Sequence, residues 1–165
     1  LTVHNDVIVL GSSFGAFLGI QGVQQLSSTE RESIKGMFLF APLFFLKHEQ
    51  FGLISDEMEL HWRKHGAYSL PYGEPPVRVP VHVSFLDEVA HYEIGRIDNR
   101  IPTTLFHGED DDIVPILQSR RYVEMCPHIA LVPLSGGHSL LSHSDLLVSE
   151  VSRRIKELAQ NGSIG

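Results

Sequence analysis

The sequence predicts an α/β fold, in which a mostly parallel sheet carries helices on both faces. Short apolar runs rich in β-branched residues alternate with longer stretches of helical character along most of the chain. Strands that alternate with helices are typical of parallel sheets, because each crossover places a helix on one face of the sheet. A length of 165 residues is typical of one domain.

The first elements lie before residue 43. Residues 7–10 are wholly apolar, which predicts a strand buried on both faces, and a helix is expected from about residue 16 to residue 23. Ser27 and Glu30 have the spacing of a capping box at a helix start. A second strand is expected over residues 37–41, where the following proline ends it.

Regular alternation returns near residue 100. Strands are expected over residues 102–108 and 128–134, and a helix that begins with a proline over residues 115–125. The closing helix is expected over residues 145–159, because its apolar residues recur on one face with a helical period.

Residues 44–100 differ in character, with dispersed aromatic residues and several prolines. Short helices are expected over residues 56–64, ended by Gly66, and over residues 84–94. We interpret residues 44–100 as a cap-like insertion within a single domain spanning residues 1–165, because prolines interrupt them too often for a core of their own.

Composition and charge exclude several classes of protein. A net charge of −7 without a run of Lys or Arg disfavours a nucleic-acid partner. No apolar run approaches the ~18 residues of a membrane span. A single cysteine cannot form an internal disulfide, and residues 1–6 do not resemble a signal peptide, so a cytoplasmic location is expected.

Gly11-Ser12-Ser13-Phe14-Gly15 lies between the first strand and the first helix. A sharp strand-to-helix turn would hold Ser13 in a strained conformation at the carboxyl edge of the sheet, and the flanking glycines would avoid collisions there. The alternative interpretation is a glycine-rich turn without chemistry.

A serine nucleophile needs a base, and the base needs an orienting acid. His138 lies in Gly136-Gly137-His138-Ser139, directly after the strand over residues 128–134. The acidic run Glu109-Asp110-Asp111-Asp112 directly follows the strand over residues 102–108. Both loops are therefore expected at the same edge of the sheet as Ser13.

These three motifs, in the chain order Ser, Asp, His, resemble the α/β-hydrolase superfamily in its small esterase- or lipase-like form. Residues 107–115 are similar to the family pattern His-Gly-x-x-Asp-x-x-Val-Pro, whose aspartate matches Asp111, although Asp110 and Asp112 stand beside it. The resemblance covers residues 5–42 and 100–160. It implies the C-terminal two-thirds of the α/β-hydrolase fold.

The resemblance also implies a function, namely a serine hydrolase that cleaves a small-molecule carboxylic ester or thioester. Ser13 would be the nucleophile, His138 the general base, Asp111 the acid that orients it, and the Phe14 N–H one donor of the oxyanion hole. No metal or organic cofactor is implied.

The sequence departs from the family pattern at its start. The family's second oxyanion donor comes from a loop upstream of the serine turn, whereas about six residues precede the first strand here. The chain therefore looks N-terminally incomplete, as though it begins within something larger. A bare strand at the sheet edge would also favour a homo-oligomer. The alternative function is a catalytically silent binding or assembly domain.

Other histidines are weaker candidates. His61 and His65 are four residues apart, a spacing that can bind zinc, but the accompanying glutamate of metalloproteases is missing and a solvated helix face is the preferred interpretation. His143 lies close to His138 in the sequence but directly before a helix, so it is the second choice for the base. His107 is expected to brace the end of its strand through a hydrogen bond.

Overall fold

The computed structural model describes residues 6–47, 52–73, 75, 77–92 and 94–160. They divide into two compact units. The sheet unit combines the chain up to Phe44 with the chain from Ile94 onward, and the hairpin unit is Phe45–Glu93.

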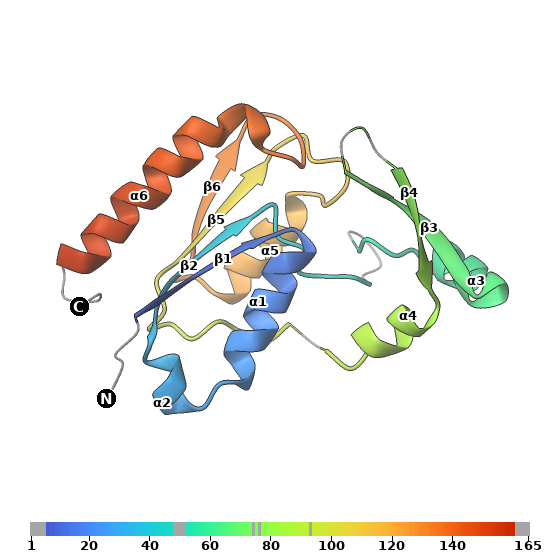
Figure 1. Ribbon diagram of the computed structural model, residues 1–165, viewed down its shortest axis with the longest axis horizontal. Coiled ribbons are helices and arrows are strands. Elements are labelled where there is room, and N and C mark those ends of the chain that lie inside the picture. Colours follow the sequence, from blue (N-terminus) through green and yellow to red (C-terminus); the bar gives the residue numbers. More distant parts are fainter. Residues whose placement is uncertain (1–5, 48–51, 74, 76, 93, 161–165) are drawn as a thin grey trace. The chain divides into compact units, whose positions relative to one another are not determined.

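The sheet unit is built on four parallel strands, as Figure 1 shows. In chain order they are β1 (Val7–Ser12), β2 (Ile34–Phe40), β5 (Thr103–Gly108) and β6 (Ala130–Leu134). Their spatial order is β1-β2-β5-β6, and every neighbouring pair is parallel. All four carboxyl ends therefore lie at one edge of the sheet, which is where the loops after β1, β5 and β6 begin.

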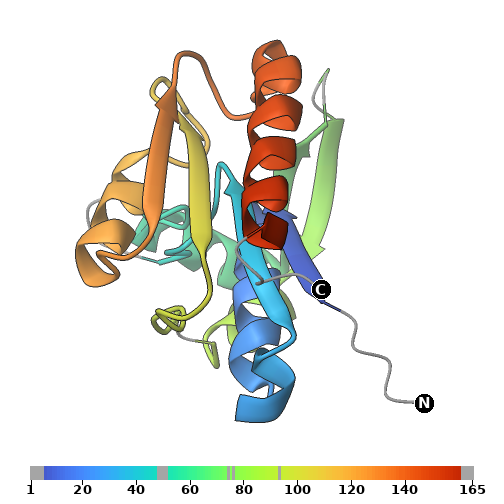
Figure 2. The same ribbon diagram turned by 90° about the vertical axis from the view of Figure 1, so that its left-hand side faces the viewer.

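Helices cover both faces of this sheet. They are α1 (Phe14–Gln25), the short α2 (Ser28–Arg31), α5 (Leu117–Met125) and α6 (Ser144–Gln160), with a 3₁₀ turn at Leu141–His143. Figure 2 shows α6 and α5 on opposite sides of the sheet. The predicted fold class, a mostly parallel sheet with helices on both faces, is confirmed.

The packing follows from strand alternation. Phe38, Phe106 and Leu134 point toward α6 and form a buried cluster against the apolar face of that helix, including Leu147 and Val151. Intervening residues face the other side, where Phe44 stacks on Tyr122 of α5 with ring centroids 4.0 Å apart. The closing amphipathic helix is thus bound to the sheet by the apolar stripe that its sequence predicts.

The hairpin unit contains α3 (Asp56–His65), an antiparallel pair β3 (Ala67–Tyr72) and β4 (Val77–His82), and α4 (Ser84–Val89). The fully buried Trp62 is central to it: the indole N–H donates to the Val81 carbonyl at 2.9 Å, and the ring stacks on Phe85.

Several local predictions are confirmed and others are wrong. The Ser27–Glu30 capping box forms, and Gly66 ends α3 in a left-handed conformation. The strand β1 is not buried on both faces, because it is an edge strand among the described residues and Leu10 is 58% exposed. The β3–β4 hairpin was not predicted, and α4 ends at Val89 rather than near residue 94.

Candidate active site

Ser13 occupies the sharp turn between β1 and α1. Its backbone has φ 52° and ψ −122°, a combination that a residue with a side chain rarely adopts and that costs about 1–3 kcal/mol. Neighbouring backbone holds it there: the Ser13 N–H donates to the Phe40 carbonyl at 2.9 Å, and the Leu43 N–H donates to the Ser13 carbonyl at 3.2 Å. The end of β2 therefore fixes the strained serine.

The two glycines beside this turn differ in their roles. A side chain at Gly11 would come within 2.7 Å of the Ala16 Cα, so only glycine lets α1 begin directly against β1. A side chain at Gly15 would meet no atom within 4 Å among the described residues. The expectation that both glycines avoid collisions is therefore right for Gly11 and wrong for Gly15.

The loops after β5 and β6 are joined through their backbones. The Glu109 N–H donates to the Leu134 carbonyl at 2.7 Å, and the Asp110 N–H donates to the Gly136 carbonyl at 3.0 Å. A side chain at Gly108 would overlap the carbonyl oxygens of Gly136 and Gly137. Glycine at position 108 thus allows the acidic loop to lie directly against the loop that carries His138.

These loops bring three predicted side chains together. The His138 Nε2 lies 3.0 Å from the Ser13 Oγ, and its Nδ1 lies 2.8 Å from the Asp111 Oδ2. The His138 side chain is 20% exposed, whereas that of Asp111 is fully buried. One imidazole therefore connects a buried carboxylate to a hydroxyl on a strained turn.

The Asp111 carboxylate accepts hydrogen bonds at both oxygens. Oδ1 accepts from the backbone N–H groups of Ile113 and Val114, at 2.9 and 2.8 Å. Burial alone would raise its pKa, but hydrogen bonds from His107, His138 and the Val114 N–H outweigh burial and hold the Asp111 pKa well below its usual range. Asp111 is therefore ionised at neutral pH, beside the imidazole that bridges to Ser13.

The alternative candidates lie elsewhere. Asp110 and Asp112 are exposed, and of the three neighbouring aspartates it is Asp111 that bonds to His138. The His143 Nε2 donates to the Ser135 carbonyl. His61 and His65 lie on an exposed face of α3 in the hairpin unit.

Phe14, predicted to supply an oxyanion-hole N–H, is the first residue of α1, and its ring stacks on Phe17. Its backbone therefore lies at the positive end of a 12-residue helix, directly beside Ser13.

Neither a family model nor a curated protein matches the sequence, but solved structures do. Alpha/beta hydrolase domain-containing protein 10 from mouse superimposes with a TM-score of 0.72 at 22% identity, over 92% of this chain and 62% of that chain. A monoacylglycerol lipase of Paleococcus ferrophilus superimposes with a TM-score of 0.64 at 19% identity, over 93% and 69%. The chain has the α/β-hydrolase fold.

A third similar structure is the esterase EaEST from Exiguobacterium antarcticum, with a TM-score of 0.61 at 16% identity, over 92% of this chain and 67% of that chain. The chain thus spans less than two thirds of the length of the mouse protein and about two thirds of the two enzymes. Because the identities are only 16–22%, these superpositions show a shared fold and nothing more specific.

One neighbour of Asp111 was not predicted from the sequence. His107, in β5, is fully buried, and its Nε2 lies 2.8 Å from the Val114 carbonyl and 3.2 Å from the Asp111 Oδ2. The bond to Val114 is the expected brace at the end of the strand. The one sequence signal for the contact with Asp111 is that a histidine lies four residues before the acid.

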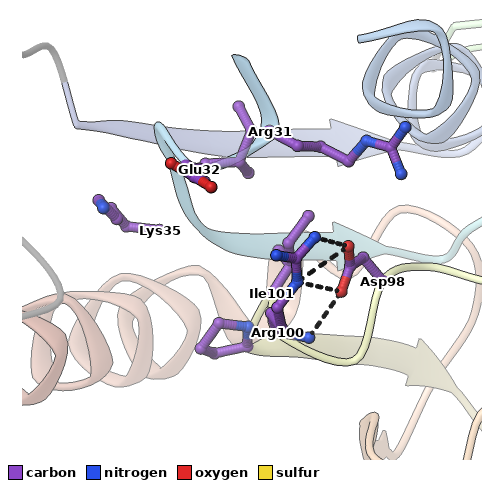
Figure 3. Close-up of a pocket in the computed structure, with 8 residues that line it drawn as sticks. Arg31, Glu32, Lys35, Asp98, Arg100 and Ile101 are labelled. Atoms are coloured by element: carbon purple, nitrogen blue, oxygen red, sulfur yellow. Dashed lines mark hydrogen bonds and ion pairs between the residues drawn. The ribbon is translucent and has the colours of Figure 1, made fainter. Parts of the chain in front are cut away.

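A cavity of about 370 Å³ lies at the amino ends of β2 and β5, far along the strands from Ser13. Figure 3 shows Arg100 turned onto Asp98 within it, with the remaining charged side chains around them. The Arg31 guanidinium donates to the Leu26 carbonyl, and Lys35 pairs with Asp6 at 3.5 Å. These cations already have partners, and the residues that line the cavity do not include Ser13, Asp111 or His138.

Among the residues that the structure describes, no group of three or more His, Cys, Asp or Glu side chains is arranged to hold a metal ion. Within the same residues, no helix has both the length and the apolar character that crossing a membrane requires.

Proposed function

We propose that the chain is a serine hydrolase that cleaves a carboxylic ester or thioester through an acyl-enzyme on Ser13. The observation that carries this proposal is the bridging imidazole of His138, 3.0 Å from the Ser13 Oγ and 2.8 Å from the Asp111 Oδ2. Acyl transfer to a serine requires a base that is hydrogen-bonded to the nucleophile and an acid that orients the base.

The proposed reaction begins with proton transfer. The Ser13 Oγ attacks the carbonyl carbon of the substrate while its proton moves to the His138 Nε2, and the carbonyl π electrons move onto oxygen. As the oxyanion collapses, the bond to the leaving alcohol or thiol breaks, and that group takes the proton from His138. A water molecule then attacks the acyl-enzyme by the same route and releases the carboxylic acid and Ser13.

In this scheme Asp111 and Phe14 stabilise the charges that form during the reaction. The Asp111 carboxylate accepts the His138 Nδ1–H, which leaves Nε2 free of hydrogen to act as base and stabilises the imidazolium that forms. We assign one oxyanion donor to the Phe14 N–H, where the positive end of α1 favours negative charge. The position of Phe14 supports this assignment, because it directly follows the strained Ser13 and is the first residue of α1.

The same chemistry supports a proposal for the substrate class, as do similar structures that are named an esterase and a monoacylglycerol lipase. We propose small-molecule esters or thioesters as substrates and a cytoplasmic site of action. Hydrolysis of a short nitrophenyl ester, compared with a thioester of the same acyl group, would tell which leaving group is preferred.

The deciding experiment is covalent labelling with a fluorophosphonate, which reacts with an activated serine. We expect the folded chain to be labelled on Ser13, and Ser13→Ala to lose both the label and ester hydrolysis. Ser12→Ala is the matched control, because Ser12 is the exposed neighbour on the same turn. It should be labelled at the wild-type rate.

The opposite results would overturn the proposal. If folded wild-type chain takes no label, or if Ser13→Ala hydrolyses the ester as fast as wild type, Ser13 is not a nucleophile. A catalytically silent binding domain with an α/β-hydrolase fold would then be the better interpretation.

A further inference from the structure

Asp111 is in contact with two imidazoles, of which the proposed reaction uses one. The second belongs to His107, whose side chain is fully buried in β5. Its Nε2 lies between two oxygens, the Val114 carbonyl at 2.8 Å and the Asp111 Oδ2 at 3.2 Å. A carbonyl and an ionised carboxylate can only accept, so the His107 Nε2 carries a hydrogen. It donates that hydrogen to the Val114 carbonyl, and its contact with Oδ2 helps to lower the Asp111 pKa.

The other nitrogen of the His107 ring contacts α5. Its Nδ1 lies 2.7 Å from the Oγ of Ser119, which is itself fully buried. In the neutral imidazole this nitrogen accepts from the Ser119 hydroxyl, so both ring nitrogens have partners and the ring plane is set by two elements.

The consequence for Asp111 is that each carboxylate oxygen lies within contact distance of two nitrogen atoms. Oδ1 is held by the N–H groups of Ile113 and Val114, and Oδ2 by His138 and His107. Without His107, the remaining donor to Oδ2 would be His138, whose imidazole also contacts the Ser13 hydroxyl. The His107 Nε2 already carries a hydrogen, so it contacts Oδ2 without taking up the proton that moves to His138.

We propose that His107 is a positioning residue for the reaction, because its Nε2–H holds the Asp111 Oδ2 where that oxygen accepts from the His138 Nδ1. This inference rests on the proposed function, since it gives Asp111 its role through His138. Among the residues that the structure describes, the polar contacts of His107 are with Asp111, Val114 and Ser119, so it acts on the acid rather than on Ser13.

Two amide substitutions at one position separate positioning from mere packing. In His107→Gln the side-chain amide N–H reaches about as far as the imidazole Nε2, whereas in His107→Asn it reaches about as far as Nδ1, toward Ser119. Both keep a polar, uncharged group in the buried site. We expect fluorophosphonate labelling of Ser13 to slow about ten- to a hundredfold in His107→Asn, and by less than that in His107→Gln.

A stability control is available in the same unit. The buried Tyr122 hydroxyl donates to the Gly95 carbonyl at 2.9 Å and accepts from the Ile97 N–H at 3.2 Å, away from Asp111. Tyr122→Phe should lower the urea midpoint yet be labelled at the wild-type rate. The proton resonance of the His138 Nδ1–H, read by NMR, should shift in His107→Asn and stay in place in Tyr122→Phe.

The outcomes decide between the two proposals. If wild type is labelled and His107→Asn is labelled equally fast with an unchanged His138 resonance, the positioning role is wrong and the proposed function stands. If both amide variants slow labelling only in proportion to their loss of stability, as judged against Tyr122→Phe, His107 is structural. If wild type takes no label, the proposed function fails and this role fails with it.

Discussion

The two ends of the four-stranded sheet each hold a carboxylate with a lowered pKa, and they differ in everything else. At the amino end, the hydrogen bonds and charge of Arg100 hold the Asp98 pKa well below its usual range. The Arg100 side chain is 62% exposed, and its guanidinium makes three hydrogen bonds to the carboxylate. At the carboxyl end, the fully buried Asp111 is held by two imidazoles and two backbone N–H groups.

A shifted pKa therefore does not by itself indicate a reaction site. Arg100 stays protonated throughout, so the Asp98 pair has no proton to exchange and, being exposed, stabilises the fold little. Beside Asp111 lies His138, whose imidazole has a nitrogen that can accept a proton and lies 3.0 Å from the hydroxyl of a strained serine. The neighbour that can change its protonation state distinguishes the two ends.

The largest expected effect comes from Asp111→Asn. Since Oδ1 must still accept from the Ile113 and Val114 N–H groups, the new NH₂ takes the place of Oδ2 and faces His138 and His107. A donor there favours the His138 tautomer with hydrogen on Nε2, which cannot act as base. We expect ester hydrolysis to fall about 10⁴-fold.

The rate of nitrophenyl ester hydrolysis and the rate of Ser13 labelling both measure this effect. Asp112→Asn is the matched control, because Asp112 is the exposed neighbour of Asp111 and should leave both rates unchanged. A fall of less than tenfold in Asp111→Asn would contradict the role given to the acid.

Gly108→Ala should give the next largest effect. The added methyl group would overlap the carbonyl oxygens of Gly136 and Gly137, and backbone cannot move aside as a flexible side chain can. We expect the free energy of unfolding to fall by about 1–3 kcal/mol, and Ser13 labelling to slow because His138 follows Gly137 directly.

Urea denaturation measures the loss of stability in Gly108→Ala. Gly22→Ala, in α1 with open space around it, is the control. It should raise stability by about 0.5–1 kcal/mol. Equal stability in Gly108→Ala and wild type would mean that the two loops do not depend on their close approach.

The sequence predicts the sheet unit well for a physical reason. Its strand β2 contains a continuous apolar run over residues 37–40, and α6 has a helical apolar stripe, so local pattern and final burial agree. The positions of Ser13, Asp111 and His138 also follow from local pattern, because parallel strands bring their carboxyl-end loops to one edge.

Other features depend on partners that local pattern does not show. The β3–β4 hairpin was not predicted because Pro71 and Pro80 argue against a central strand. In a two-stranded pair, however, each strand has one side without a partner strand, and a proline there removes no ladder hydrogen bond. The exposure of Leu10 depends on which strand stands at the edge, and the contact between His107 and Asp111 depends on the path of the loop after β5.

The smallest expected effect concerns the ion pair between Asp98 and Arg100 at the amino end of the sheet. Because the Asp98 pKa is lowered on folding, the pair contributes stability that is present above the unfolded-state pKa and is lost as the pH falls toward the folded-state pKa. Asp98→Asn keeps an oxygen for the Arg100 N–H, which now donates to Oδ1 at 3.0 Å, but removes the charge.

We therefore expect Asp98→Asn to lower the free energy of unfolding by about 0–1 kcal/mol at pH 7, with wild type and variant converging below about pH 4. Urea denaturation at pH 7 and pH 3, at low and high salt, measures this difference, which salt should reduce because the guanidinium is exposed. Labelling of Ser13 should be unchanged. A slower label in Asp98→Asn would mean that the two ends of the sheet are coupled, and the distinction between a structural ion pair and a proton-transfer site would then no longer hold.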